Sequence, residues 1–150
     1  KSKIKDIAWN QSQVSDCSHL LVFAAWDNYT EDRINHMFDL TNEIRGFKNE
    51  GWENYRQQLL SNYPQKDPQK NFEHAARQTY IAFMSAITQA AVEGLDSTPM
   101  EGFDSYRLKK ILNLPKKAQI CMVIGAGKRD PKGLYGKQFR FDNDLFIKEI

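Results

Sequence analysis

The chain has 150 residues, 41% of them hydrophobic and 27% charged, which is the size and composition of one globular domain. Its 21 basic and 19 acidic residues give a formal net charge of +2, and both signs are interspersed along the sequence. This pattern gives no support to binding of nucleic acid or of a membrane surface. No apolar run reaches the roughly 20 residues that cross a bilayer, and no signal-peptide core follows Lys1, so we expect a cytoplasmic protein.

The first half of the chain predicts helices around one strand. Residues 3–17 read as two short helical pieces that meet near Asn10, and the unbroken apolar run over residues 18–26 predicts a strand that is central in a sheet and covered on both faces. A helix follows between Thr30, a good N-cap, and Gly46. The spacing predicts a shorter helix over residues 52–60.

The second half contains the longest predicted helix. Two prolines interrupt residues 63–68, and apolar residues then keep helical spacing over residues 71–93, up to Gly94. Small residues on the other side of this helix indicate that it is contacted on more than one side. Asp104 is expected to cap a helix that runs to residue 112, residues 118–126 predict a second buried strand, and a Gly-, Lys- and Arg-rich loop follows.

Two strands buried on both faces are too few for a stable sheet in water. Further strands must come from a segment upstream of Lys1, from the C-terminal tail, or from the tail of a partner subunit. The aromatic tail over residues 139–147 favours an interleaved dimer. The two cysteines, Cys17 and Cys121, each lie beside an apolar run without metal-ligand or redox spacing, so we expect both thiols to be buried.

The sequence contains no motif that is typical of hydrolytic enzymes or metal sites. The sequence has no Gly-x-Ser-x-Gly motif and no phosphate-binding P-loop, and its three histidines lack metal-ligand spacing. The pair Gly125 and Gly127 follows a strand but lacks the rest of a dinucleotide fingerprint. If the protein is an enzyme, a cofactor is expected to carry the chemistry.

Residues 95–104 read as a binding loop between two helices. Pro99 restrains its backbone and Gly102 relaxes it, and such a loop presents main-chain N–H groups to a flat ligand.

Several segments in the same order resemble the nitroreductase family of FMN-dependent NAD(P)H oxidoreductases. The matching residues lie in four segments, 10–23 (NQSQVSDCSHLLVF), 76–82 (ARQTYIA), 94–104 (GLDSTPMEGFD) and 139–141 (FRF). The resemblance implies an α+β nitroreductase-like fold with a central sheet flanked by helices, a long central helix and an interleaved homodimer with FMN at the interface. It also implies ping-pong transfer of electrons from NADH or NADPH, through the flavin, to a nitroaromatic, quinone or similar small-molecule acceptor.

The same resemblance implies the site residues. Asn10 and Gln13 would meet the polar edge or the ribityl side of FMN, Pro99, Met100, Glu101 and Gly102 would lie along the isoalloxazine face, and Arg140 would hold the phosphate with help from Lys137. A main-chain N–H of Glu101 or Gly102 would donate to flavin N5. Each residue also has an ordinary structural role open to it: Asn10 as a helix cap, Gln13 and Glu101 as solvated side chains, and Arg140 as the ion-pair partner of a nearby aspartate.

The resemblance also implies that residues 1–150 form a single nitroreductase-like domain that lacks the family's Arg- and Ser-rich N-terminal segment. That departure keeps two other hypotheses open. One is a flavin-free fragment or dimerisation scaffold of the same fold, and the other is a flavin enzyme of the same superfamily with different chemistry, such as dehalogenation or flavin breakdown.

Overall fold

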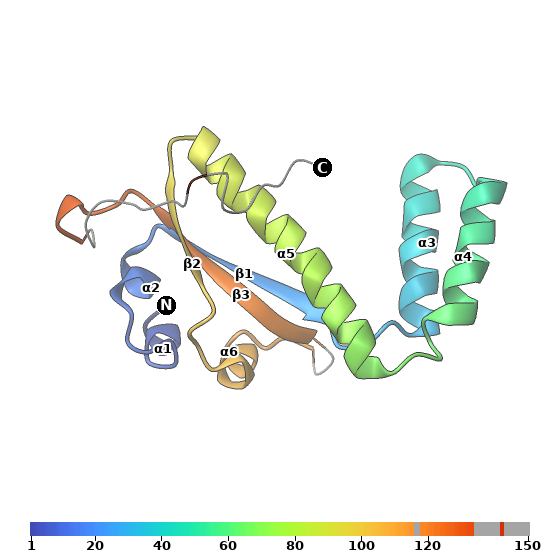
Figure 1. The fold of residues 1–150 in the computed structure, drawn as a ribbon, viewed down its shortest axis with the longest axis horizontal. Helices are drawn as coiled ribbons and strands as arrows, with labels where there is room; N and C mark the ends of the chain where they lie inside the picture. The colour runs from blue at the N-terminus through green and yellow to red at the C-terminus, as the bar shows by residue number, and fades with distance from the viewer. Residues whose placement is uncertain (116–117, 134–141, 143–150) are drawn as a thin grey trace.

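The computed structural model describes residues 1–115, 118–133 and 142, and it has the predicted α+β architecture. Within this part of the chain, three antiparallel strands form a sheet in the order β1, β3, β2. Helix α5 runs along one side of the sheet, and α1, α2 and α6 lie on the other (Figure 1). The elements are α1 (Ser2–Lys5), α2 (Ser12–Asp16), β1 (His19–Trp26), α3 (Glu31–Arg45), α4 (Glu50–Asn62), α5 (Pro68–Val92), β2 (Asp96–Met100), α6 (Ser105–Ile111), β3 (Ala118–Gly127) and a 3₁₀ turn (Pro131–Gly133).

The order of the strands corrects two of the sequence predictions. β3 is central and pairs with both neighbours, whereas β1, predicted to be central, is an edge strand of the described sheet. Its apolar residues are accordingly not all covered: Leu21 is 42% exposed and Trp26 is 39% exposed. The second neighbour of β3 is β2, which comes from the segment predicted to be a loop.

Segment 96–100 looks like a loop in the sequence because polar residues and a proline interrupt it. In the structure it forms an edge strand, where a proline is tolerated because an N–H that faces away from the sheet is not needed for pairing. Pro99 lies opposite Ile124 and Met100 lies opposite Val123. Tertiary pairing with an already formed strand therefore overrides weak local strand propensity.

A β-bulge interrupts the pairing of β1 with β3. Phe23 lies opposite Met122 and Ala24 lies opposite Ile120, so the backbone at Cys121 is the extra residue of β3. The extra residue shifts the alternation of side chains by one position. As a result Ile120 and Val123 face the same side of the sheet and join one core.

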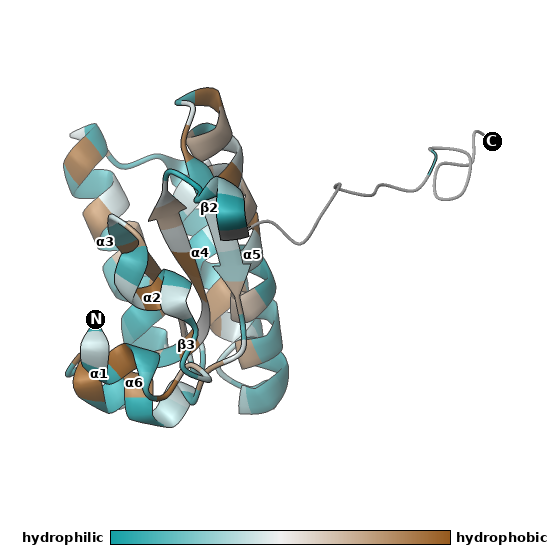
Figure 2. Ribbon diagram, turned by 90° about the vertical axis from the view of Figure 1, so that its left-hand side faces the viewer, coloured by the Kyte–Doolittle hydropathy of each residue, from teal (hydrophilic) through white to brown (hydrophobic). Residues whose placement is uncertain are grey.

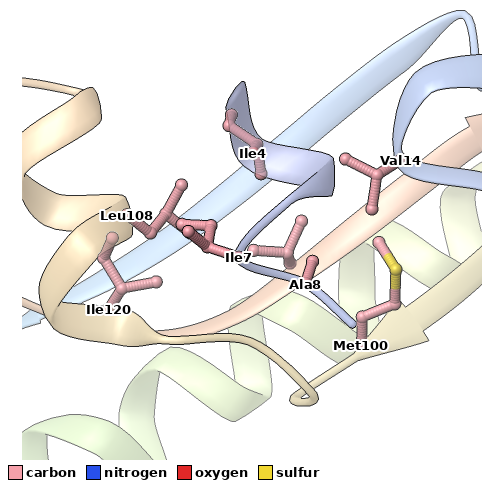
Figure 3. Packing of buried hydrophobic residues seen from close by; sticks show 8 residues of the cluster. Ile4, Ile7, Ala8, Val14, Met100, Leu108 and Ile120 are labelled. Atoms are coloured by element: carbon pink, nitrogen blue, oxygen red, sulfur yellow. The ribbon is translucent and has the colours of Figure 1, made fainter. Parts of the chain in front are cut away.

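The main core lies between the sheet and the short helices on its α1, α2 and α6 side (Figure 3). Its largest contribution from a helix is Leu108 of α6, which is fully buried, and the side chain of Met100 closes the cluster from β2. Burial of apolar side chains of this size stabilises the fold by about 1.5–3 kcal/mol each. The buried members of the cluster are Ile4, Ile7, Ala8, Val14, Met100, Leu108, Ile120 and Val123.

Local signals in the sequence place the starts of α3 and α6 and the end of α5 as predicted, whereas α5 begins at Pro68, three residues before the predicted start, with Asp67 as its N-cap. Thr30 caps α3 through Arg33 N–H, and Asp104 caps α6 through Arg107 N–H at 2.9 Å. Helix α5 ends with Gly94 in the left-handed conformation (φ 68°), where Leu95 N–H donates to the Ala90 carbonyl. The 6→1 hydrogen bond and the left-handed glycine are those of a Schellman motif.

Helices α3 and α4 form a hairpin that stands apart from the sheet in Figure 1. Phe38 packs against Trp52 with ring centroids 4.4 Å apart, and Arg56 of α4 bonds to Asp39 of α3 at 2.8 Å. Along α3 both hydrophobic and hydrophilic residues are visible in the colouring of Figure 2, as expected of a helix that buries one face. Ile44, which the spacing places on the apolar face of α3, is nevertheless 77% exposed.

A buried joint connects this hairpin to the rest of the protein. Asn71 of α5 is 1% exposed, and its side-chain N–H₂ group donates to Asn28 at 2.7 Å and to the Tyr63 carbonyl at 2.8 Å. Tyr29 bonds to His74 at 2.9 Å, and burial, followed by the neighbouring Tyr63, raises the pKa of its phenol. The joint ties both connections of the hairpin to the start of α5.

Cys17 is a free cysteine but is only half-buried, because it lies at the end of the short helix α2. Among the described residues, none of the helices is both long enough and apolar enough to cross a membrane.

Candidate functional site

The segment after β2 is a tight turn at the edge of the sheet. Phe103 N–H donates to the Glu101 carbonyl at 2.9 Å, and this contact closes the turn over Gly102. Glu101 is exposed and Gly102 is half-buried. The carbonyls of these two residues accept hydrogen bonds, whereas their N–H groups donate to no acceptor in the part of the chain that the structure describes.

The connection between α1 and α2 holds this turn from one side of the sheet. The side-chain amide of Gln11 donates to the Gly102 carbonyl at 3.2 Å and to the Ala8 carbonyl at 3.1 Å, and it accepts from Gln13 at 2.7 Å. Asp104 N–H donates to the Ile7 carbonyl at 2.9 Å. The turn is therefore fixed to a second segment that is distant in sequence.

Trp9 covers one side of Gly102. A Cβ atom added at Gly102 would lie 2.6 Å from Cζ3 of the indole, closer than real Cβ contacts, so glycine is needed here for the close approach. Trp9 is itself 80% exposed, and both Trp9 (φ 51°) and Asn10 (φ 56°) are in the left-handed region. Two consecutive non-glycine residues of this kind hold a strained backbone, which often occurs at functional sites.

From the other side of the sheet, Tyr80 of α5 donates a hydrogen bond to the Glu101 carboxylate. Tyr80 also belongs to an open groove of about 610 Å³ along α5. Two apolar side chains of this groove are largely exposed, Ile81 at 62% and Met84 at 57%. The complete lining is Tyr80, Ile81, Met84, Ser85, Thr88 and Gln89.

The structure brings together part of the predicted site. Glu101 and Gly102 form the turn, Pro99 and Met100 precede it in β2, and Gln13 reaches it through Gln11. The Met100 side chain is 6% exposed and points into the core, so only its main chain is available to a ligand. Asn10 is exposed beside the turn and does not cap α2, whose N-cap is Gln11. Lys137 and Arg140 lie outside the described residues.

Three residues of this arrangement are not among the predicted site residues: Trp9, Gln11 and Tyr80. Gln11 lies between the two predicted polar residues, and nothing in its spacing distinguishes it from them. Tyr80 occupies a helical position whose period indicates core, and its partner is 21 residues away. Gln11 and Tyr80 lie in segments that resemble the family, but only contacts between distant segments place them and Trp9 at the turn.

The arrangement fits a flat, electron-accepting ring. Within a trans peptide the C=O and N–H groups point in opposite directions, so the bond from Phe103 to the Glu101 carbonyl directs the Gly102 N–H away from the turn's interior. N–H groups that have no acceptor among the described residues suit a ring nitrogen or carbonyl acceptor. The amides of Asn10 and Gln13 are of the type that bonds to the carbonyls of a flavin pyrimidine ring.

Solved structures share this fold. A nitroreductase structure from Bacillus subtilis superposes with a TM-score of 0.82 and 22% identity, covering 99% of this chain and 72% of that one. A second structure, from Exiguobacterium sibiricum, is described as a nitroreductase in complex with FMN. It superposes with a TM-score of 0.75 and 16% identity and covers 99% of this chain and 70% of that one.

Curated relatives that match in sequence carry similar names. A protein of Staphylococcus epidermidis named as a candidate NAD(P)H nitroreductase is 27% identical over 97% of this chain and 70% of its own length. One of Staphylococcus haemolyticus, named in the same way, is 32% identical over 88% of this chain and 66% of its own length. The chain thus spans about two thirds of the length of such relatives. The model of the nitroreductase family matches residues 1–128, and the chain therefore belongs to the nitroreductase family.

Proposed function

We propose that this chain is part of an FMN-dependent oxidoreductase that takes electrons from NADH or NADPH and delivers them to a nitroaromatic, quinone or similar acceptor. Membership of the nitroreductase family, the names of the relatives and the FMN complex of a structural neighbour support this proposal. The single observation that carries it is the turn at Glu101 and Gly102, whose two main-chain N–H groups donate to no acceptor among the described residues.

Bound FMN would supply hydride transfer at its N5 atom, and the protein's part is to bind and orient the ring. The main-chain N–H groups of Glu101 and Gly102 would donate to the ring, with Pro99 and Met100 contributing backbone beside it. Asn10 and Gln13 would bond to its polar edge. Arg140, assisted by Lys137, would hold the phosphate, since a guanidinium pairs with phosphate through two parallel hydrogen bonds.

Two half-reactions that use the same ring face in turn need no acid or base from the protein. The reductant would bind, give up its hydride and leave before the acceptor binds, which is a ping-pong order. Among the described residues there is no cluster of three or more side chains that could hold a metal ion. We expect double-reciprocal plots of initial rate against NADH or NADPH concentration, measured at several acceptor concentrations, to be parallel lines.

A second copy of this chain is the proposed occupant of the groove on α5. Ile81 and Met84 are exposed there, in the middle of the longest helix, and the proposed FMN turn adjoins the groove through Tyr80. Met84→Glu should convert the homodimer to a monomer in light scattering, whereas the control Gln58→Glu on α4 should leave the dimer intact. A wild-type monomer would refute the dimer. The cytoplasmic location stays a prediction.

The decisive experiment is the visible spectrum of the purified protein before and after addition of FMN. We expect the absorption of a bound flavin, its bleaching by NADH or NADPH under anaerobic conditions, and recovery on addition of a quinone or nitroaromatic. Arg140→Ala should lower FMN retention while far-UV circular dichroism stays unchanged. A colourless protein that takes up no FMN would refute the proposal and support the flavin-free scaffold.

If FMN binds but neither nitroaromatics nor quinones reoxidise it, the acceptor class is wrong. The remaining hypothesis is then a flavin enzyme of the same superfamily with other chemistry. A screen of halogenated aromatics with NADPH as reductant tests for dehalogenation and so distinguishes it from flavin breakdown.

A further inference from the structure

Tyr80 links the two features of the candidate site, the groove on α5 and the turn after β2. Its ring lines the groove, and its hydroxyl donates to the Glu101 carboxylate. The ring lies 6.0 Å from that of Phe83, which packs edge-on against Phe23 of β1 at 5.5 Å. Because these rings anchor α5 to the sheet, the Tyr80 hydroxyl is a well-placed donor for orienting the Glu101 side chain.

Glu101 supplies one of the two N–H donors of the turn and also has a carboxylate side chain, which accepts the hydrogen bond from Tyr80. Among the described residues, no lysine, arginine or histidine forms an ion pair with it. An ionised carboxylate only accepts hydrogen bonds, so a free one would compete for the same N–H groups that a ligand needs. Its charge would also oppose the addition of electrons to a nearby ring.

We propose that Tyr80 is a positioning residue that holds the Glu101 carboxylate toward α5. In that position the carboxylate leaves the N–H groups of Glu101 and Gly102 available, and part of its charge is compensated by the hydroxyl. The consequence is a higher reduction potential of the bound flavin. This inference rests on the proposed FMN site and assigns to a residue outside the turn the control of its redox properties.

The first test measures the midpoint potential of the FMN-loaded protein by equilibration with a reference dye. Tyr80→Phe removes only the hydroxyl. We expect the midpoint potential of its bound flavin to fall by about 30 mV, so that the ratio of oxidised to reduced flavin at a fixed dye potential rises on the order of tenfold for a two-electron couple. Tyr106→Phe is the matched control. It removes the hydroxyl of an exposed tyrosine on α6, whose ring contacts Lys110, and should leave the ratio unchanged.

The second test asks whether Tyr80 acts through Glu101. In the Glu101→Ala background the carboxylate is gone but the main-chain N–H groups remain, so adding Tyr80→Phe should no longer shift the potential. An equal shift in both backgrounds, or no shift in either, overturns the inference. FMN content is measured in parallel to show whether Tyr80→Phe weakens FMN binding instead. A lower FMN content with an unchanged midpoint potential also overturns the inference.

A third measurement needs no flavin. In flavin-free protein, Tyr80→Phe should shift the amide resonances of Glu101 and Gly102 more than Tyr106→Phe does, because the released carboxylate approaches those N–H groups. Unchanged resonances overturn the inference. If FMN binds and the potential stays constant, only the role of Tyr80 fails, whereas a protein that takes up no FMN overturns the proposed function and this inference with it.

Discussion

The side-chain amide of Gln11 and the main-chain carbonyl of Gly102 are joined by a hydrogen bond of 3.2 Å although 91 residues separate them. The same amide nitrogen also bonds to the Ala8 carbonyl at 3.1 Å, so one side chain ties the α1–α2 connection to the turn after β2. From the opposite side of the sheet, Tyr80 holds Glu101. The turn is therefore clamped by both helical layers.

Gln11→Glu tests this clamp with an isosteric change. At neutral pH a carboxylate would face two carbonyl oxygens that have lost their donor, so we expect the free energy of unfolding to fall by about 1–3 kcal/mol. Urea denaturation followed by circular dichroism measures the change, with exposed Gln65→Glu as the control. Equal midpoints for the two variants would show that the clamp contributes nothing.

Gly102→Ala tests the close approach of Trp9. The added Cβ would lie 2.6 Å from the indole, and since that ring is 80% exposed we expect it to move aside at a cost of about 1 kcal/mol or less. The indole N–H resonance of Trp9 should shift, and FMN uptake should fall. Gly51→Ala in α4 is the control and should leave that resonance in place. An unshifted Trp9 signal in Gly102→Ala would contradict the packing.

Leu108→Ala tests the core under the site. Leu108 is fully buried between α6 and the sheet, and truncation of a buried leucine costs about 2–5 kcal/mol because a cavity remains. Ile111→Ala, on the same helix but at a 38% exposed position, should cost much less. Thermal unfolding of both variants compares them directly. A smaller loss for Leu108→Ala than for Ile111→Ala would exclude the core position of Leu108.

Arg129→Gln tests the ion pair between Arg129 and Asp96, the first residue of β2. The side chain and the main-chain N–H of Arg129 both bond to the Asp96 carboxylate and lower its pKa below the ordinary 3.8. Because the pKa of Asp96 is lower in the folded state than in the unfolded state, the ion pair stabilises the fold at pH values above the unfolded-state pKa. This contribution is lost as the pH falls through the folded-state pKa.

In Arg129→Gln we therefore expect the pKa of Asp96, followed by carboxyl NMR shifts, to rise toward its ordinary value. The difference in stability from wild type should be present near neutral pH and should disappear as the pH falls through the folded pKa of Asp96, which lies below its ordinary 3.8. Because the pair is exposed, the difference should be small and should shrink in high salt. Arg107→Gln is the control, and an unchanged Asp96 titration in Arg129→Gln would contradict the pairing.

Local chemistry explains which predictions from the sequence are confirmed. The N-caps at Thr30 and Asp104 and the left-handed Gly46 and Gly94 lie where the sequence places them, because each depends on contacts within one helical turn. The predicted strand over residues 118–126 appears as β3, and the helix over residues 71–93 as α5. The resemblance to the nitroreductase family is confirmed by the family match over residues 1–128.

The errors have a common physical origin. The order of the strands, the bulge at Cys121 and the strand character of residues 96–100 depend on pairing between segments that are far apart in the chain. The apolar neighbours of Cys17 predict a buried thiol, yet Cys17 is half-buried because the short helix α2 ends there. No local pattern reports such exposure.

Residue identities alone are enough to predict the main helix caps, the two long apolar strands and the family, since propensities, caps and ordered motifs act over short distances or survive as residue identities. The convergence of Gln11, Trp9 and Tyr80 on Glu101 and Gly102 follows only from the three-dimensional packing. These contacts join three separate segments across a sheet. Their geometry arises from the packing of both layers, and no spacing within one segment encodes it.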